Sequence, residues 1–400
     1  MAWFEGFERQ TVTLGGLPVT FRRASDWNDT RPVLVLLHGF PQTHVLWHRV
    51  AQQLKDRYRI VMPDLRGYGD SSHAPGLADH ANYSKRAMAQ EVVDLLDALG
   101  VQDFFLCGHD RGGRVAHRLA VDHPTRVKKL CVIDIAPTLD MYEATDFDFA
   151  RAYYHWFHLI QPAPLPELMI GGNARAYLHA KLGGWGSQGL GYIEPEALAE
   201  YERCFCDPTP NTQGLPANIH SACEDYRASA SIDLEHDRLS RAQGQKIACD
   251  MRVLWGARGI IEHLFQPLAL WQAPCAGQVA GQLGHHALDG GHDDVTSLVL
   301  CLVASLALDR PSDAHGVVLG LAGARGSALE AGGRAPLHAA LPAPHRARRR
   351  RLRDLDPHPL FLLDRKLVEA AGRGALPART AAGVPARHGP ARPALQCRQG

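Results

Sequence analysis

One short stretch, residues 104–114, constrains the fold of this chain more than any other. It reads FFLCGHDRGGR, which is an apolar run, a turn flanked by glycines, and the start of a helix that continues to Val121. Gly108 and Gly112 leave room for a strained backbone at Asp110 and for a close approach between strand and helix. The pattern therefore predicts a sharp strand–turn–helix unit that presents the Asp110 side chain.

The turn has the form glycine-x-nucleophile-x-glycine, which presents a reactive side chain at the end of a strand. Asp110 occupies the central position, where an esterase would have serine. A carboxylate nucleophile forms an ester with an alkyl carbon, so it suits displacement at carbon better than acyl transfer. The simpler interpretation is a solvated carboxylate at a helix N-terminus, where the helix dipole favours an anion. Features elsewhere in the chain distinguish the reactive carboxylate from the solvated one.

Strand and helix patterns alternate around this turn. A helix with apolar residues at regular spacing is predicted over 84–99, with Gly100 as its stop. Alternation of this kind predicts an α/β fold with a mostly parallel, doubly wound sheet and a site at the carboxyl ends of its strands. The predicted strands are a hairpin over 10–21 that turns at Gly15-Gly16, followed by 32–37, 58–62, a short strand that starts at 104, then 127–133, 251–256 and 278–283.

The strand pattern is interrupted between residues 139 and 248, where helical, aromatic-rich segments take its place. We interpret 139–248 as a helical cap inserted over the carboxyl edge of the sheet. The core domain then consists of 1–138 and 249–308, and 294–308 is predicted to form its closing helix.

Residues 309–400 differ in composition from everything before them. They are rich in Ala, Gly, Pro and Arg, contain a basic run at 346–353, and show no sustained apolar period. Such composition predicts a disordered tail. It is either a real appended tail or the product of a shifted reading frame, and the second is our hypothesis. A nucleic-acid-binding arm is disfavoured because the basic run lacks interleaved aromatic residues.

Composition argues against several classes of function. Lys and Arg number 43 against 42 Asp and Glu, so no strong field favours nucleic acid or a membrane surface. The nine cysteines are scattered without a disulfide framework, which is typical of a reducing compartment. No signal peptide is recognisable, and no run reaches the roughly 18 apolar residues of a membrane span. We therefore expect a soluble, cytoplasmic protein that acts on a small molecule.

Several motifs are long enough to identify a family. They are HGFPQT at 38–43, DLRGYGDS at 64–71, GHDRGGR at 108–114, DIAPT at 134–138, YYHWF at 153–157 and CEDYRA at 223–228. Over about residues 1–308 the chain resembles the haloacetate dehalogenases, the fluoroacetate-cleaving branch of the α/β hydrolases. The resemblance implies an α/β-hydrolase fold, action on a carbon–halide bond, no metal or organic cofactor, and a homodimer.

The same resemblance implies roles for residues around the turn. Asp110 matches the nucleophile, which attacks the halogen-bearing carbon and leaves a glycolyl ester. Arg111 and Arg114 match the arginines that bind the substrate carboxylate, for which a guanidinium offers forked donors. The backbone N–H groups of Phe40 and Arg111 match the oxyanion-type donors of this fold. Without the resemblance, the two arginines read as a solvated first helical turn, although cations there oppose the helix dipole.

In the cap, His155, Trp156 and Tyr226 match the residues that cradle the departing halide. A small anion taken out of water needs several such donors. The alternative is that the three side chains only pack the cap. Residues 208–216 look like a short insertion before Tyr226.

The acid of the expected catalytic triad is assigned to Asp134 because its more common position is empty of carboxylates. No carboxylate follows Trp255-Gly256 at the position where many α/β hydrolases carry it. Asp134, after the preceding strand, then takes the role of orienting the histidine, in agreement with the family's DIAPT segment. Glu262 is a weaker candidate.

The histidine base is the point at which the chain departs from its family. The region reads GQLGHHALDGGHDD over 281–294. Counting back from the closing helix selects His285, whereas matching a Gly-Gly-His pattern selects His292. We favour His285 as the base and keep His292 and then His286 as alternates. If none of them works, the ester on Asp110 forms but is not hydrolysed.

We therefore expect hydrolysis of a 2-haloacetate such as fluoroacetate to glycolate and halide. An epoxide hydrolase with the same Asp–His–Asp set is one alternative, with Tyr153, Tyr154 or Tyr226 as donors to the epoxide oxygen. Arg111 and Arg114 disfavour it, because a neutral epoxide gives them nothing to bind. The other alternative is a binding protein or inactivated enzyme without a working histidine base.

Overall fold

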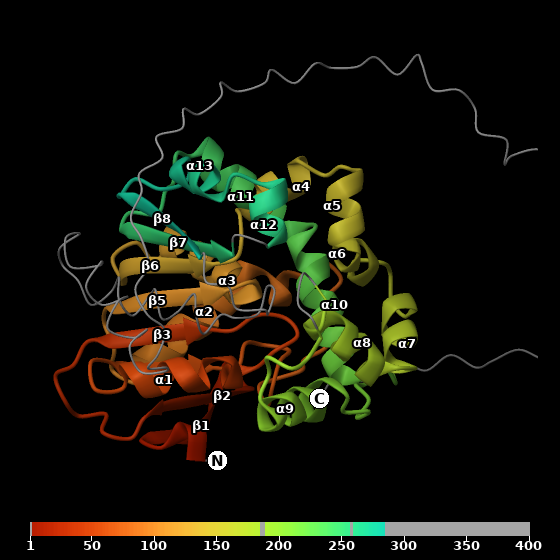
Figure 1. The fold of residues 1–400 in the computed structure, drawn as a ribbon, viewed down its shortest axis with the longest axis horizontal. Helices are drawn as coiled ribbons and strands as arrows, with labels where there is room; N and C mark the ends of the chain where they lie inside the picture. The colour runs from red at the N-terminus through yellow and green to blue at the C-terminus, as the bar shows by residue number, and fades with distance from the viewer. Residues whose placement is uncertain (1, 185–188, 257–258, 285–400) are drawn as a thin grey trace, which may run out of the picture. The chain divides into compact units, whose positions relative to one another are not determined.

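A computed structural model of the chain describes residues 2–184, 189–256 and 259–284 (Figure 1). The predicted closing helix over 294–308 and the tail over 309–400 lie outside these ranges. So do the three candidate histidines, His285, His286 and His292.

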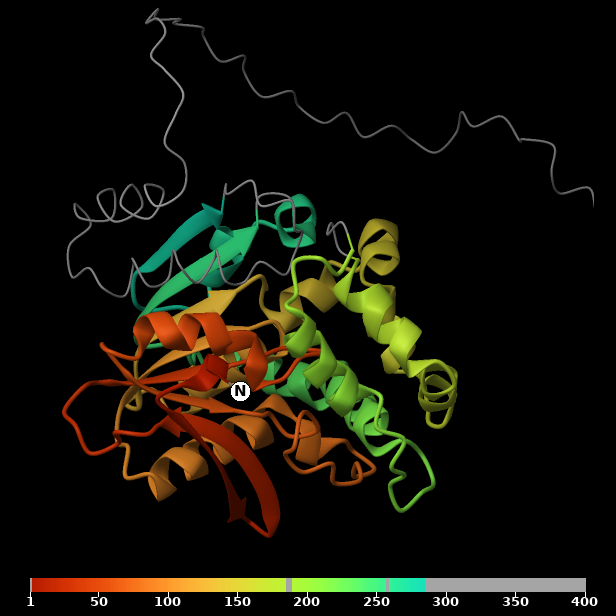
Figure 2. The same ribbon diagram turned by 60° about the horizontal axis from the view of Figure 1, so that its bottom comes forward.

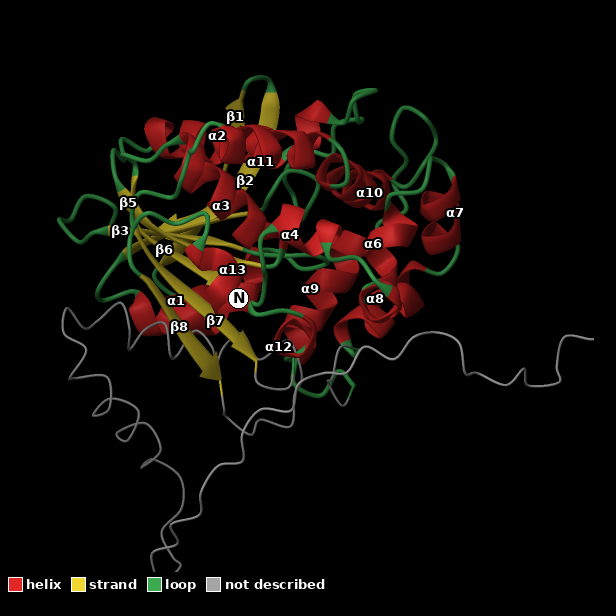
Figure 3. Ribbon diagram, turned by 90° about the horizontal axis from the view of Figure 1, so that it is seen from above, coloured by secondary structure: helices red, strands yellow, loops and turns green. Residues whose placement is uncertain are grey.

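A mixed sheet forms the centre of the described residues, and its strands follow the order β1-β2-β4-β3-β5-β6-β7-β8. β1 and β2 form the predicted hairpin, β2 pairs antiparallel with β4, and all the remaining pairs are parallel. Figure 3 shows the twist of the sheet from the hairpin edge to β7 and β8. The α/β-hydrolase fold with a mostly parallel sheet is therefore confirmed. The strands are β1 (Phe7–Leu14), β2 (Leu17–Ala24), β3 (Val33–Leu37), β4 (Arg59–Pro63), β5 (Phe104–His109), β6 (Val127–Ile133), β7 (Asp250–Gly256) and β8 (Val279–Gly284).

Helices cover the central strands on both faces, which is why those strands read as continuous apolar runs. Every residue of β3, with the sequence VLVLL, is buried. Figure 2 shows α1 (His48–Leu54) on one side of the sheet and α2 (Lys85–Ala98) on the other. α2 packs against α3 (Arg111–Asp122), which in turn packs on β5 and β6. Ser84 caps α2 by accepting a hydrogen bond from the backbone of Ala87 at 3.1 Å.

The chain between β6 and β7 adds no strand to the sheet within the described residues. Its helices gather at one end of the sheet, next to the carboxyl ends of the parallel strands (Figure 1). We call this segment the cap, and its predicted bounds of 139–248 stay a prediction. Its helices are α4 (Thr138–Glu143), α5 (Phe147–Ala152), α6 (Tyr154–Leu159), α7 (Leu165–Gly171), α8 (Ala174–Leu182), α9 (Pro195–Phe205), α10 (Ala217–Ser229) and α11 (Ile232–Ala242).

The remaining helical elements are short. α12 (Ile260–Leu264) and α13 (Pro267–Gln272) connect β7 to β8. Single 3₁₀ turns occur at Ala2–Phe4, His44–Trp47 and Ala81–Tyr83. Among the described helices, none combines the length and the apolar character needed to cross a membrane.

Candidate active site

Asp110 lies at the turn between β5 and α3, as the sequence pattern predicts. Its backbone has φ 47° and ψ −115°, a region that residues other than glycine rarely adopt. The turn is closed by close contacts at its glycines. A Cβ added to Gly108 would lie 2.4 Å from the carbonyl oxygen of Gly112, and one added to Gly112 would lie 2.3 Å from that of His38. Side chains at these two positions would force strand and helix apart and move Asp110.

The loop after β3 reaches the Asp110 carboxylate. The backbone N–H of Phe40 donates to Asp110 Oδ1 at 2.9 Å. The approach depends on Gly39, where an added Cβ would lie 2.6 Å from the Cβ of Asp110. The second predicted backbone donor, Arg111, directly follows Asp110 at the first position of α3. A backbone N–H on the Asp110 carboxylate suits chemistry in which negative charge builds on that oxygen.

Arg114 is a guanidinium buried one helical turn after Asp110, with 3% of its surface exposed. Nη1 donates to the carbonyl of Ala136 at 3.2 Å and to Oγ1 of Thr138 at 2.9 Å. Within the part of the chain that the structure describes, no carboxylate forms an ion pair with it, and Nε has no hydrogen-bond partner. Burial and then the charge of Arg111 lower its pKa. Arg114 is therefore a buried cation to which no described carboxylate supplies a counter-ion.

Arg111 is equally buried but already paired with a carboxylate that the sequence analysis missed. Its Nε and Nη2 donate to the two carboxylate oxygens of Asp225 at 2.8 and 2.7 Å. Lys85 and the Tyr68 hydroxyl bind the same carboxylate, the latter at 2.6 Å. Burial would raise the pKa of Asp225, but Arg111 and Lys85 outweigh it and hold the pKa well below its usual range. Only Nη1 of Arg111 has no partner among the described residues.

The predicted halide residues lie together above the two arginines. His155 and Trp156 come from α6 and Tyr226 from α10, and the Tyr226 ring lies 5.7 Å from the first and 6.4 Å from the second. The guanidinium of Arg114 lies 4.7 Å from the centre of the Trp156 ring, and that of Arg111 lies 4.1 Å from the Tyr226 ring. The structure therefore places the three predicted cradle residues over the carboxylate-binding candidates.

Phe40 and the loop before α10 complete the surroundings of the cradle. The Phe40 ring stacks on His155 at 6.2 Å and meets Tyr226 edge-on at 5.4 Å. Residues 208–216, which look like an insertion, run between α9 and α10, where Pro210 and Pro216 form an isolated β-bridge. Tyr226 is still brought beside His155, so the loop does not disturb the motif.

Burial sets the protonation of the cradle. It lowers the pKa of His155 well below its usual value, with further contributions from the charges of Lys181, Arg111 and Arg114. Burial also raises the pKa of Tyr226, and the nearby charge of Asp110 adds to that rise. His155 is therefore neutral and Tyr226 keeps its hydroxyl proton, so both can donate to an anion.

The other tyrosines proposed as epoxide donors differ in position. Tyr153 is 6% exposed, and its ring lies 5.6 Å from that of His155. Burial and then the charge of Asp110 raise its pKa. Tyr154 is 47% exposed, and the Lys181 ammonium lies 3.9 Å from its ring. Tyr153 and Tyr226 thus face the site, whereas Tyr154 faces outward.

Asp134 occupies the turn after β6, the strand next to β5. Its φ is 56°, its side chain is buried, and its backbone N–H donates to the carbonyl of Leu254 on β7 at 2.8 Å. In the same way, the backbone N–H of Asp110 donates to the carbonyl of Ile133, the last residue of β6, at 3.2 Å. Glu262, the weaker candidate for the acid, instead accepts a hydrogen bond from the Trp255 indole on β7. Asp110 and Asp134 therefore follow neighbouring parallel strands, as a nucleophile–acid pair requires.

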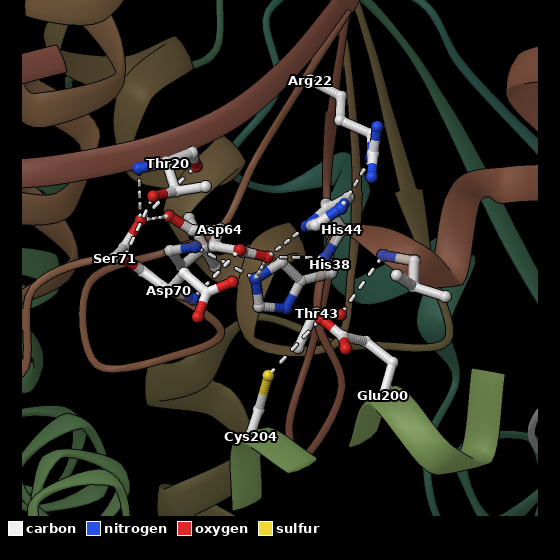
Figure 4. A network of polar contacts seen from close by, with 12 residues as sticks. Thr20, Arg22, His38, Thr43, His44, Asp64, Asp70, Ser71, Glu200 and Cys204 are labelled. Carbon is white, nitrogen blue, oxygen red and sulfur yellow. Dashed lines mark hydrogen bonds and ion pairs between the residues drawn. The ribbon is translucent and has the colours of Figure 1, made fainter. Parts of the chain in front are cut away.

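A buried polar network lies behind the loop of residues 38–44, which we call the Phe40 loop (Figure 4). Asp64 Oδ1 accepts hydrogen bonds from the backbone N–H and from Nδ1 of His44, both at 2.8 Å. His44 Nε2 in turn accepts from Nε of Arg22 at 3.0 Å. Burial would raise the pKa of the Asp64 carboxyl, but His44 outweighs it and lowers the pKa to about 2.

This shift predicts a pH dependence of stability. Because an Asp carboxyl of the unfolded chain has a pKa near ~3.9, the depressed folded value stabilises the protein above about pH 4 by roughly 2 kcal/mol. The stabilisation is lost as the pH falls through the folded pKa of about 2. Urea unfolding of the wild type and Asp64→Asn should therefore give free energies that differ most near pH 6, begin to converge below about pH 4 and meet only below about pH 2. A difference in free energy that does not change with pH would contradict this attribution to the Asp64 carboxyl.

Comparison with known proteins agrees with this geometry. The family model of the alpha/beta hydrolase fold matches residues 32–172, a range that contains Asp110 and Asp134. A fluoroacetate dehalogenase of Burkholderia sp. is 42% identical over 298 residues, covering 74% of this chain and 93% of that protein. A soluble epoxide hydrolase of Corynebacterium sp. (strain C12) is 31% identical over 211 residues, covering 51% of this chain and 67% of that protein. The crystal structure of an α/β hydrolase from Nostoc sp. PCC 7120 superposes with a TM-score of 0.66 at 44% identity, covering 80% of this chain and 100% of that one.

The sheet order, the strained turn at Asp110 and the family match define an α/β hydrolase. Within that superfamily the chain belongs to the fluoroacetate dehalogenase family, whose members are hydrolases acting on carbon–halide bonds. The predicted family and enzyme class are thus confirmed.

Proposed function

We propose that this enzyme hydrolyses a 2-haloacetate, fluoroacetate included, to glycolate and halide through an ester on Asp110. The observation that carries the proposal is Arg114, a guanidinium buried one helical turn from Asp110 with no acidic partner among the described residues. A buried charge without a counter-ion is costly, so such a site favours a ligand that supplies one. A substrate carboxylate does so, whereas a neutral epoxide does not.

Substrate binding uses the donors that the protein leaves open. Nε of Arg114 and Nη1 of Arg111 have no partner in the described ranges, and both belong to buried guanidinium groups. A carboxylate bound there is held by charge-assisted hydrogen bonds in a low-dielectric site. The halogen-bearing carbon, one bond away from that carboxylate, then lies next to Asp110.

The first chemical step is displacement at that carbon. Oδ1 of Asp110 is held by the Phe40 N–H, so Oδ2 is the oxygen that attacks. A carbon–oxygen bond forms as the carbon–halogen bond breaks, and the halide leaves with the bonding electron pair. His155, Trp156 and Tyr226 donate to it as it departs, which matters most for fluoride because that anion is the most strongly hydrated.

The second step is hydrolysis of the ester. A histidine base, for which we propose His285 with His292 and His286 as alternates, takes a proton from water while Asp134 orients its ring. The water oxygen attacks the Asp110 carboxyl carbon, and negative charge builds on Oδ1. The backbone N–H groups of Phe40 and Arg111 stabilise that charge while the bond between the carboxyl carbon and Oδ2 breaks. The departing glycolate oxygen takes the proton from the histidine, the remaining proton of the water passes to solvent, and the Asp110 carboxylate is restored.

A screen of four compounds tests the proposal. Fluoroacetate and chloroacetate should be turned over, while chloroacetamide, the neutral analogue, should lose about 100-fold in kcat/KM because its amide cannot pair with the arginines. Halide release and glycolate formation are the measurements. Styrene oxide should give no diol, and turnover of styrene oxide alone would overturn the proposal.

Epoxide hydrolysis stays the second candidate, and a specific observation favours it. The rings of Tyr153 and Tyr226 lie 5.6 and 5.7 Å from that of His155. Burial raises the pKa of both hydroxyls, so two donors to an epoxide oxygen are available. The styrene oxide arm of the screen decides between the two functions.

A further inference from the structure

The hydrogen bond from Phe40 to Asp110 depends on how the Phe40 loop is held. The N–H of Phe40 is a backbone group, so only the position of the loop can aim it. The loop leaves β3 at its start and enters the 3₁₀ turn His44–Trp47 at its end. Both of its ends carry a buried histidine, His38 and His44.

The two histidines bind the same short segment, Asp64 and Leu65, at the end of β4. At the start of the loop, His38 Nε2 accepts from the backbone N–H of Leu65 at 3.0 Å, so Nδ1 carries the proton and donates to the carbonyl of Gly39 at 3.1 Å. At its far end, the backbone N–H and Nδ1 of His44 both donate to Asp64 Oδ1 at 2.8 Å. Segment 64–65 therefore fixes both ends of the Phe40 loop. Figure 4 shows the end at which Asp64 meets His44.

The Asp64 carboxylate itself has little freedom to move. It is 1% exposed, and a Cβ added to Gly69 would lie 2.2 Å from its Cγ. Its second oxygen accepts from the backbone N–H of Asp70 at 3.3 Å. Arg22 donates to His44 Nε2, which leaves the His44 proton on the nitrogen that faces Asp64. Packing and hydrogen bonds thus lock both partners of the Asp64–His44 contact.

We infer that Asp64 is a positioning residue for hydrolysis of the Asp110 ester, because its hold on His44 keeps the Phe40 N–H on Oδ1 of Asp110. The inference rests on the proposed function, since it concerns the second of the two steps. In the first step Oδ2 attacks carbon, and a donor on Oδ1 gives no help. In the second step Oδ1 becomes the oxyanion, and a misplaced N–H removes its stabilisation.

Asp64→Asn tests the inference. The neutral amide accepts more weakly from His44, and its NH₂ group meets the backbone N–H of Asp70. After a short incubation with chloroacetate, intact-protein mass spectrometry should show the glycolyl adduct accumulating in the variant. Once chloroacetate is removed, the adduct should decay at least about 10-fold more slowly than in the wild type, since loss of an oxyanion donor costs about 100- to 1000-fold. Halide release in the first turnover should stay near the wild-type rate.

Asp70→Asn is the matched control. It makes the same chemical change six residues further along the chain, but the Asp70 carboxylate pairs with Arg9 and Arg203 at the surface and not with the Phe40 loop. Its adduct should decay at the wild-type rate. Equal slowing of both steps in Asp64→Asn, or no adduct, would reduce Asp64 to a structural role and overturn the inference.

Failure of the proposed function is a separate outcome. It shows in the wild type, which would then form neither adduct nor glycolate. The positioning of the loop is then measured by hydrogen–deuterium exchange of the peptide that contains residues 38–47. Exchange there should be faster in Asp64→Asn than in Asp70→Asn, and equal exchange in the two variants would overturn the inference.

Discussion

Replacing Asp110 by asparagine should lower haloacetate turnover by at least about 10⁴-fold, as loss of a covalent nucleophile does in other hydrolases. The amide has no charge to drive displacement of halide, so neither halide release nor an adduct is expected. The fold should survive, because asparagine has nearly the same size and shape as aspartate and its amide oxygen can still accept the Phe40 N–H at Oδ1. Initial rates of halide release, together with intact-protein mass, measure the effect.

The control for this variant is its stability. A thermal midpoint within a few degrees of the wild type would show that the loss lies in the chemistry. Turnover within about 10-fold of the wild type, in protein whose sequence is verified, would mean that Asp110 is not the nucleophile.

Replacing Arg114 by methionine should have the second largest effect on activity, with little effect on stability. Loss of a charge-assisted pair with the substrate carboxylate should lower kcat/KM for chloroacetate by about 100- to 1000-fold, mainly through KM. The free energy of unfolding should change by only about 1 kcal/mol, because the hydrogen bonds to Ala136 and Thr138 are lost but a buried cation without a carboxylate partner is removed as well.

Arg111→Met is the matched comparison, because the chemical change and the helix are the same. This variant removes the bidentate partner of the buried Asp225 carboxylate and leaves it only Lys85 and Tyr68, which should cost about 3 kcal/mol in stability. Urea unfolding of the two variants measures the contrast. If Arg114→Met proves to be the more destabilising, or leaves KM unchanged, Arg114 is not the substrate anchor.

This contrast shows how far the sequence alone could reach. The motif GHDRGGR predicts a turn, a nucleophile and two arginines, because these features are local. It treats Arg111 and Arg114 alike, since the partner of Arg111 is Asp225 on α10, which is 114 residues away. Asp225 precedes Tyr226 in the CEDYRA motif, and an acidic residue beside a cradle residue is the signal that could have revealed it.

The same difference between local sequence pattern and long-range contact explains which elements of the fold the sequence predicts and which it does not. The strands and α2 were predicted closely, because a buried strand or an amphipathic helix of 14 residues carries its own periodic pattern. Helices α7 and α8 of the cap were not predicted individually. They are short, and α7 exposes Leu165, Leu168 and Met169, so tertiary contacts and not local pattern determine them. The histidine base lies outside the described residues, and its identity stays a prediction.

The central claim is that Asp110 becomes an ester during turnover, and a single-turnover reaction in ¹⁸O-labelled water tests it most directly. With enzyme in excess over chloroacetate, the first glycolate should carry unlabelled oxygen taken from the Asp110 carboxylate. The ¹⁸O should appear in the peptide that contains Asp110. Glycolate labelled in its first turnover, with an unlabelled peptide, would mean that water attacks the substrate directly and would contradict the account.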